Sequence, residues 1–307
     1  MISASPLPTR SPRSFEVPTL ILWAVIHVGW AGLTFFHDRV PGLMLALAGG
    51  WLVAWHSAFQ HEAIHGHPTS SPRLNTALAS IPLSLWLPFP AYRRSHVAHH
   101  ATHDLTAPGQ DPEARYFDSA ALESPLRRAL SRTASTLLGR LLLGPMIEVG
   151  SFLVDEARLV LADRQDRRAI WSVHLLLVGA LTAWLVLVCG MSLGQYLLCF
   201  VYPGVALTLL RSFAEHRAHA DPAQRIAIVE NAPVLGLLFL NNNLHAAHHE
   251  RPGLAWYDLP AFHARERARL VAGNGGLVYD GYGEVCRRYL LSAHDHLDHA
   301  LALERSR

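Results

Sequence analysis

The sequence is poor in cysteine and charge, and it has no lysine. Three cysteines, Cys189, Cys199 and Cys286, are too few and too scattered for a disulfide framework or a thiolate metal site. Charged residues make up only 16% of the chain, and the formal net charge of +2 argues against nucleic acid as a partner. A glycine-rich dinucleotide motif, a haem-binding segment and a ferredoxin-like cysteine pattern are also missing, which excludes a fused electron-transfer domain.

Long apolar runs account for the hydrophobic half of the composition. Four runs, at about 17–36, 41–59, 169–189 and 193–212, each have roughly the 20 residues that cross a bilayer as a helix. Short turns join the first to the second and the third to the fourth, so the sequence predicts two transmembrane hairpins. Residues 1–16, rich in serine and proline, are expected to form a disordered tail. The first run lacks a cleavage site and is interpreted as a retained span.

The remaining residues, 60–168 and 213–307, are more polar and are expected to form a helical cap within a single domain, 17–307. Segment 75–90 is short and interrupted by prolines, which favours a re-entrant or interfacial position. Segment 133–154 carries charges and a proline, which favours a helix along the membrane surface. Two arginines precede the first span, twelve lie in 60–168 and ten follow residue 212, against one and none in the two turns. The positive-inside rule therefore predicts that both termini and the cap are cytoplasmic.

Histidine is the compositional outlier, with 20 residues, and it occurs in three spaced groups. HEAIH contributes His61 and His65, HVAHH contributes His96, His99 and His100, and HAAHH contributes His245, His248 and His249. On a helix the spacing i, i+3, i+4 places the members of a group on one face, so each triplet is expected to converge on a common centre. All three groups fall on the cytoplasmic side of the predicted topology.

A ninth candidate is His216 in RSFAEHR, which follows the fourth span as His61 follows the second. Imidazole ligands suit iron, copper or zinc, and this number exceeds the four ligands of a structural zinc site, so a redox site with two metals is favoured. The flanking acids Glu62, Asp104, Glu215 and Glu250 are candidates to accept the second ring N–H of a ligand, and we expect at most two of them to do so.

Two other kinds of site stay open on the residues alone. His61, Glu62 and His65 match the HExxH motif of zinc metalloproteases, in which the glutamate is the general base. This motif leaves both H-x-x-H-H boxes unexplained. A non-catalytic metal carrier or sensor would use the same histidines without consuming O₂.

Taken together, HEAIH, LTAPGQDPEARY (105–116) and HAAHHERPGLAWYDLP (245–260) resemble the membrane-bound fatty acid desaturase superfamily of histidine-rich, non-haem diiron enzymes. RSFAEHR is similar to the extra histidine motif of membrane alkane hydroxylases and some bacterial desaturases. The resemblance implies an all-α integral membrane fold of four transmembrane helices with a cytoplasmic cap. It also implies two iron ions, no separate catalytic acid or base, and nine histidine ligands: His61, His65, His96, His99, His100, His216, His245, His248 and His249.

The reaction implied first is O₂-dependent desaturation of an aliphatic C–C bond in a fatty acyl chain or a similar lipid-like or specialised metabolite. Hydroxylation ranks second, and a third box followed by tryptophan and L-P is shared with carotenoid ketolases. The two electrons are expected from a separate ferredoxin, rubredoxin or flavoprotein. Arg93, Arg94, Arg127 and Arg128 are candidates to dock an acidic donor or anionic lipid headgroups.

Overall fold

Four long helices form the core of the structure, a computed structural model that describes residues 15–114, 124–164 and 166–295. Each is long and apolar enough to cross a membrane. They are α1 (Val17–Phe35), α2 (Gly42–Ile64), α8 (Arg167–Ala183) continued by the π-helical turn η3 (Trp184–Val188), and α9 (Leu193–Tyr196), η4 (Leu197–Val201) and α10 (Tyr202–Glu215) as one continuous rod. The four predicted spans are confirmed, whereas the predicted disordered tail falls almost entirely outside the described residues.

The second span extends farther than its apolar run. The prediction ended at residue 59, where polar residues begin, but α2 continues to Ile64 because Gln60, His61 and Glu62 are buried by neighbouring elements rather than exposed to water. Gln60, for example, donates a hydrogen bond to the carbonyl of Ala79 at 2.8 Å. The last turn of the span thereby becomes the first wall of the histidine site.

Small residues bring α2 against the last span. A Cβ atom on Gly50 would lie 2.7 Å from Cβ of Pro203, and one on Gly204 would lie 2.6 Å from Val53. Any larger side chain at these positions would force the helices apart, and close backbone approach through small residues is how membrane helices pack. This contact holds the middle of α2 against the start of α10 and so fixes the two spans relative to each other.

The first hairpin turn contains the short helix η1 (His37–Arg39). The cap is built from shorter elements whose bounds are as follows: α3 (Pro72–Ala79), α4 (Phe89–Ala101), α5 (Pro125–Ala134), α6 (Leu137–Leu142), α7 (Gly144–Leu161), η5 (Pro222–Arg225), α11 (Pro233–Leu238), α12 (His245–Glu250), α13 (Leu259–Gly273) and α14 (Gly281–Tyr289). Two short strands, β1 (Ile228–Val229) and β2 (Val278–Tyr279), pair in parallel and were not predicted.

The prediction of one helix over 133–154 was wrong. The segment is divided among the end of α5, all of α6 and the first part of α7. Thr136 starts α6 by accepting a hydrogen bond from the backbone N–H of Gly139 at 3.1 Å, and Pro145 sits in the first turn of α7. An N-cap and a proline each favour a new helix start, which outweighs the apolar periodicity of the segment.

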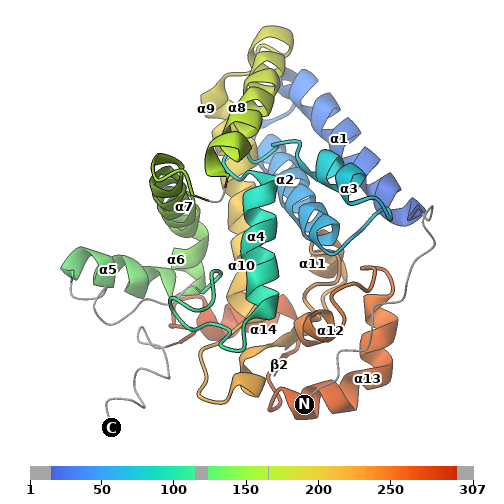
Figure 1. Ribbon diagram of the computed structural model, residues 1–307, viewed down its shortest axis with the longest axis vertical. Coiled ribbons are helices and arrows are strands. Elements are labelled where there is room, and N and C mark those ends of the chain that lie inside the picture. Colours follow the sequence, from blue (N-terminus) through green and yellow to red (C-terminus); the bar gives the residue numbers. More distant parts are fainter. Residues whose placement is uncertain (1–14, 115–123, 165, 296–307) are drawn as a thin grey trace.

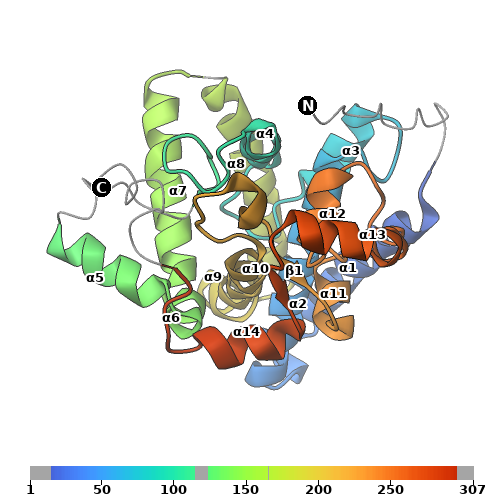
Figure 2. The same cartoon turned by 90° about the horizontal axis from the view of Figure 1, so that it is seen from below.

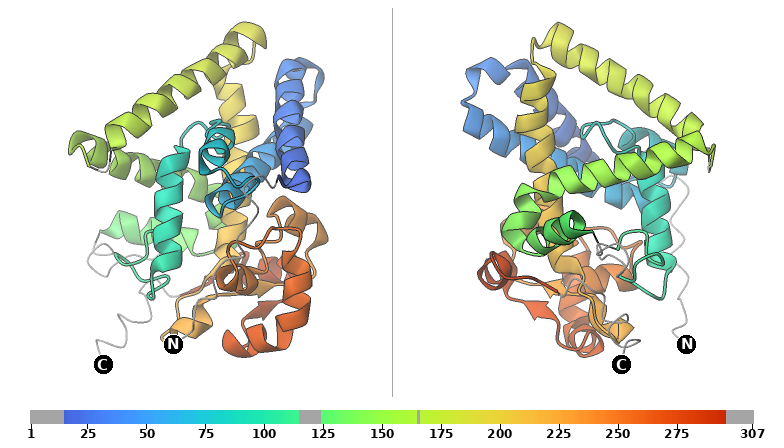
Figure 3. Two further views of the ribbon diagram at one scale, coloured as in Figure 1. Left: turned by 45° about the vertical axis from the view of Figure 1, so that its right-hand side comes forward. Right: turned by 90° about the vertical axis from the view of Figure 1, so that its left-hand side faces the viewer.

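Both hairpin turns lie at one end of the molecule, at the top of Figure 1, and the cap lies at the other end. Viewed from below, α12, α13 and α14 lie in front of the ends of the spans (Figure 2). Helix α8 leans away from α1 (Figure 3), and much of its surface is apolar and exposed, as expected for contact with lipid. The histidine-bearing ends of α2 and α10 therefore point into the cap.

Candidate metal centre

Four elements bring all nine predicted histidines together. The end of α2 supplies His61 and, directly after it, His65; α4 supplies the second box; His216 follows α10; and α12 supplies the third box. The histidines form two clusters, and within each cluster the ring nitrogens lie within 4.8 Å of one another. The five-histidine cluster contains His61, His65, His96, His100 and His248, and the four-histidine cluster contains His99, His216, His245 and His249.

Each H-x-x-H-H box is divided between the two clusters, in contrast to the expectation of a common centre. On α4, His96 and His100 are one helical turn apart and enter the five-histidine cluster, while His99 enters the four-histidine cluster. On α12 the split is reversed, because His248 alone joins the five-histidine cluster. Three residues correspond to about 300° of helix rotation and four to about 400°, so i+3 and i+4 diverge enough to address two adjacent centres.

The Nε2 atoms face one another at short distances. In the five-histidine cluster, Nε2 of His96 lies 3.1 Å from Nε2 of His65 and 3.1 Å from that of His100, which in turn lies 3.1 Å from Nε2 of His248. In the four-histidine cluster, Nε2 of His245 lies 2.9 Å from Nε2 of His216 and 3.1 Å from that of His249.

The ring protons of the facing pair at 2.9 Å lie on the opposite nitrogens. Nδ1 of His216 lies 3.3 Å from the carbonyl oxygen of Arg225, which can only accept, and Nδ1 of His245 lies 3.2 Å from Oδ1 of Asn242. Each ring therefore donates from Nδ1, which leaves an Nε2 lone pair directed at the other ring. Two lone pairs at this distance repel unless a cation lies between them, and neutral imidazole is the form that binds metal.

The spacing also fits a metal ion. Imidazole nitrogens bind at about 2.0–2.1 Å, so two of them at a right angle around one ion are separated by about 2.9 Å. Burial keeps the rings neutral: it lowers the pKa of His100 and of His216 to about 3, and it lowers the pKa of His245, His248 and His249 well below the usual value. The donor set therefore fits one metal ion in each cluster.

Acidic side chains hold the outer nitrogens of the α4 histidines. Nδ1 of His99 lies 2.8 Å from Oδ1 of Asp111, and Nδ1 of His96 lies 3.2 Å from Oε1 of Glu113. Burial alone would lower the pKa of His99, but the hydrogen bond to Asp111 and the neighbouring acids raise it. Both acids belong to the segment LTAPGQDPEARY and were missed as site residues, because a separation of 12 or 17 residues through a loop has no periodicity that links them to the box.

Two of the four acids considered from the sequence contact the site. Glu215 Oε1 lies 3.4 Å from Nδ1 of His245, and Glu62 Oε1 lies 3.8 Å from Nδ1 of His61. Glu250 instead forms an ion pair with Arg269, at 2.6 Å. Among the described residues, no contact joins Asp104 to a histidine of either cluster.

Asparagines and the small sheet fix α12. Asn242 receives the ring N–H of His245 and donates from Nδ2 to Glu215 at 3.1 Å. Asn243 donates from Nδ2 to the carbonyl of Val229 in β1 at 2.7 Å, and its own carbonyl accepts from Val229 N at 2.8 Å. The run Asn241–Asn243 therefore anchors the third box, a role that its sequence position alone did not reveal.

The comparison with protein families agrees with this site. The fatty acid desaturase family model matches residues 39–282, which include all nine histidines. The chain belongs to the fatty acid desaturase family. A search of curated proteins found no match.

In this desaturase-family chain the HExxH interpretation has no geometric support. A metalloprotease glutamate lies on the metal side of its histidines, where it activates water. Glu62 instead lies 3.8 Å from Nδ1 of His61, and its Oε2 is held by a hydrogen bond from the backbone N–H of Trp256 at 3.1 Å. His61 and His65 also share their cluster with three further histidines, which a zincin site does not contain.

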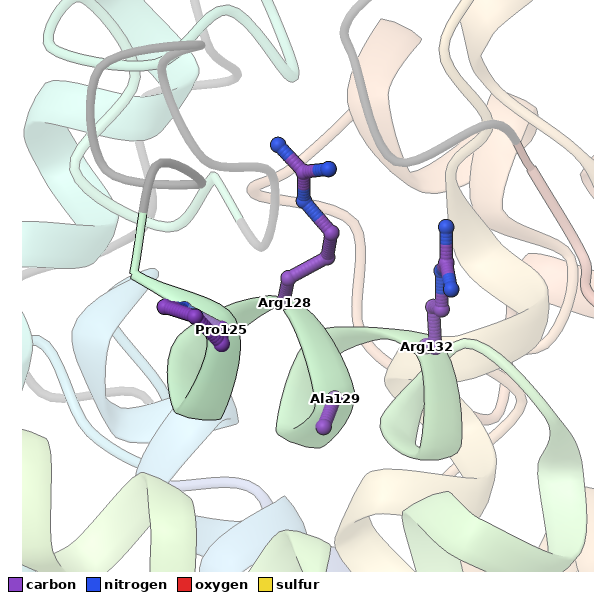
Figure 4. A pocket seen from close by; sticks show the side chains of 4 residues that line it. All are labelled: Pro125, Arg128, Ala129 and Arg132. Atoms are coloured by element: carbon purple, nitrogen blue, oxygen red, sulfur yellow. The ribbon is translucent and has the colours of Figure 1, made fainter.

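Other features of the described chain lie outside the centre. The other histidines of the described residues belong to neither cluster: His27, His37, His56, His67, His103, His174, His219, His263 and His294. His296 and His299 lie outside the described residues. A shallow hollow of about 280 Å³ on α5 is lined by Pro125, Arg128, Ala129 and Arg132, and the two arginines extend from the same side of the helix (Figure 4). None of its lining residues belongs to the clusters, so it is not the metal site.

Proposed function

We propose that this membrane protein is an O₂-dependent oxidase that desaturates an aliphatic C–C bond of a fatty acyl chain or a similar lipid-like or specialised metabolite, with one iron ion in each histidine cluster. The observation that carries the proposal is the pair of facing Nε2 lone pairs of His216 and His245, 2.9 Å apart, within a constellation of nine histidines. Membership of the desaturase family supports iron over other metals that imidazole accepts.

The overall reaction would convert R–CH₂–CH₂–R, O₂, two electrons and two protons into an alkene and two molecules of water. Two bound iron ions would supply the ability to activate O₂ for hydrogen removal from an unactivated carbon. The chain's own contribution is to present nine imidazoles and to hold the outer nitrogens of several of them. Asp111, Glu113, Glu215 and Asn242 do this for His99, His96 and His245, and so fix the tautomers that bind metal.

The electrons are proposed to come from a separate donor on the cytoplasmic side. Arg93 and Arg94 are exposed on α4, the helix that carries the second box, and provide positive charge for an acidic ferredoxin- or rubredoxin-type partner. Anionic lipid headgroups would be attracted by the same charge. Hydroxylation is the alternative outcome of the same site, since the position of the substrate carbon relative to the metals decides whether a second hydrogen is removed.

Metal content and product mass test this proposal together. Protein purified in detergent should contain about two iron ions per chain and consume O₂ when given a reductant and substrate. His248→Ala should lose metal and activity, whereas His103→Ala, which removes an exposed histidine next to the second box, should keep both. A product two hydrogens lighter than the substrate indicates desaturation, and one oxygen heavier indicates hydroxylation. Reversible metal binding without O₂ consumption would instead establish a carrier or sensor.

A further inference from the structure

An arginine on the fourth span lies next to residues that neighbour histidines of both clusters. Arg211 and Glu215 are one turn apart on α10, with Nε of Arg211 3.0 Å from Oε1 of Glu215. Their side chains are only 13% and 5% exposed. A buried ion pair is costly to desolvate and contributes little net stability, so stability alone does not explain why this pair is present.

The first contact of Arg211 leads to the four-histidine cluster. The same Glu215 oxygen accepts a hydrogen bond from Nδ2 of Asn242 at 3.1 Å and lies 3.4 Å from Nδ1 of His245. Because Glu215 is almost fully buried, its orientation depends on these partners. Arg211 therefore fixes the carboxylate that fixes His245.

The second contact leads to the five-histidine cluster. Arg211 also lies beside Tyr92, and its guanidinium interacts electrostatically with the Tyr92 hydroxyl. Tyr92 is one turn before His96 on α4, and the two ring centroids are 5.8 Å apart. Desolvation raises the pKa of Tyr92 to about 12, so the phenol keeps its proton and remains a hydrogen-bonding partner rather than an anion.

The chemistry of arginine suits this double contact. Its planar guanidinium presents five N–H donors at fixed angles, so one side chain can hold a carboxylate and a hydroxyl in a fixed relative position. Lysine offers a compact charge that can pair with Glu215 but does not reproduce the fork. The two partners sit on different helices: Glu215 on α10 lies beside His245 of the four-histidine cluster, and Tyr92 on α4 lies beside His96 of the five-histidine cluster.

We propose that Arg211 is a positioning residue shared by both clusters, acting on His245 through Glu215 and on His96 through Tyr92. The proposal rests on the proposed function only in that both clusters bind metal. It adds a residue that is neither a ligand nor in contact with one. Its loss should weaken metal binding at two sites at once.

Anaerobic titration of the detergent-solubilised full chain with Fe(II) tests this inference. The binding steps are assigned with His65→Ala and His249→Ala, each of which removes a ligand from one cluster. Arg211→Met should weaken both steps by up to about 10-fold, the lower end of the effect of removing a direct partner of a ligand, because Arg211 acts one contact further out. Tyr92→Phe should weaken only the five-histidine step, and Glu215→Gln only the four-histidine step. Arg168→Met, at an exposed arginine, should change neither.

Rescue separates positioning from a general structural role. Arg211→Lys should restore the four-histidine step, through its charge on Glu215, but leave the five-histidine step weak. Wild-type affinity at both steps in folded Arg211→Met, or a change at one step only, would overturn the shared role. If Arg211→Met does not fold, Tyr92→Phe and Glu215→Gln decide: the proposal fails unless they weaken different steps. Wild-type protein that binds fewer than two iron ions would overturn the proposed function itself.

Discussion

The acidic partner of His99 differs between the sequence-based prediction and the structure. Asp104 follows the second box directly and was a candidate from the sequence, whereas the structure places Asp111 against the ring of His99. The perturbations are therefore Asp111→Asn and its matched control, Asp104→Asn, in the same segment. Both substitutions remove one negative charge and preserve side-chain size, so they differ only in what the carboxylate contacts.

The three bonds of Asp111 set the expected magnitude. Oδ1 accepts from His99 Nδ1 at 2.8 Å and from Glu113 N at 2.9 Å, and Oδ2 accepts from Thr106 N at 2.8 Å. An asparagine has one acceptor oxygen, so its NH₂ group must face one of these donors, which are buried and cannot turn to water. Loss of an outer partner weakens metal affinity by about 10–100-fold, or about 1.4–2.8 kcal/mol.

Anaerobic Fe(II) titration measures the effect, with iron content determined after dialysis. Asp111→Asn should lose affinity at the four-histidine cluster and retain it at the five-histidine cluster, while Asp104→Asn should bind like the wild type. Unchanged affinity in Asp111→Asn together with a loss in Asp104→Asn would refute the assignment of Asp111. Equal losses in both would show that the negative charge of the segment matters rather than the contact to His99.

Three further outcomes are expected. Gly50→Val should push α2 away from Pro203 and lower both the thermal unfolding midpoint and the iron content. Gly179→Val, in open space on α8, should change neither. Equal unfolding midpoints for the two variants would contradict the packing argument. Glu230→Gln should lower the free energy of unfolding by about 0.5–1 kcal/mol at pH 7. The hydrogen bond from Arg267 lowers the pKa of Glu230, so its contribution to stability is present above pH 4.5 and is lost as the pH falls below it. A difference in stability between variant and wild type that persists in acid would exclude this cause. A reporter fused to the C-terminus should be cytoplasmic, and a periplasmic signal would exclude the proposed topology.

The four spans were predictable because a bilayer imposes one simple requirement, about 20 apolar residues for each helix. The burial of the end of α2 was not, since the polarity of Gln60, His61 and Glu62 marks only the end of the apolar run, and it is distant parts of the chain that cover them. The failure at 133–154 has a different, local origin: Thr136 and Pro145 each favour a new helix start, which divides the segment.

The grouping of the histidines was predictable because they repeat at i, i+3 and i+4, a spacing that keeps side chains close together on a helix. Their outer partners carry no such signature. Asp111 and Glu113 reach α4 from a loop, and Asn242 reaches His245 across the turn before α12. Any acid or amide within reach would serve, so the selection is made by the path of the backbone, which the sequence alone does not give.

The division of each box between two clusters explains why the spacing is i, i+3, i+4 and not i, i+4, i+8. A ladder with the longer spacing keeps its side chains on one stripe of a helix and serves one centre. With the shorter spacing, His99 diverges from His96 and His100, and His248 diverges from His245 and His249. Since α4 gives two histidines to the five-histidine cluster and α12 gives two to the other, each helix contributes to both clusters. The spacing of the two boxes thus matches two adjacent histidine clusters, and we expect a shift of one residue in either helix to disturb both.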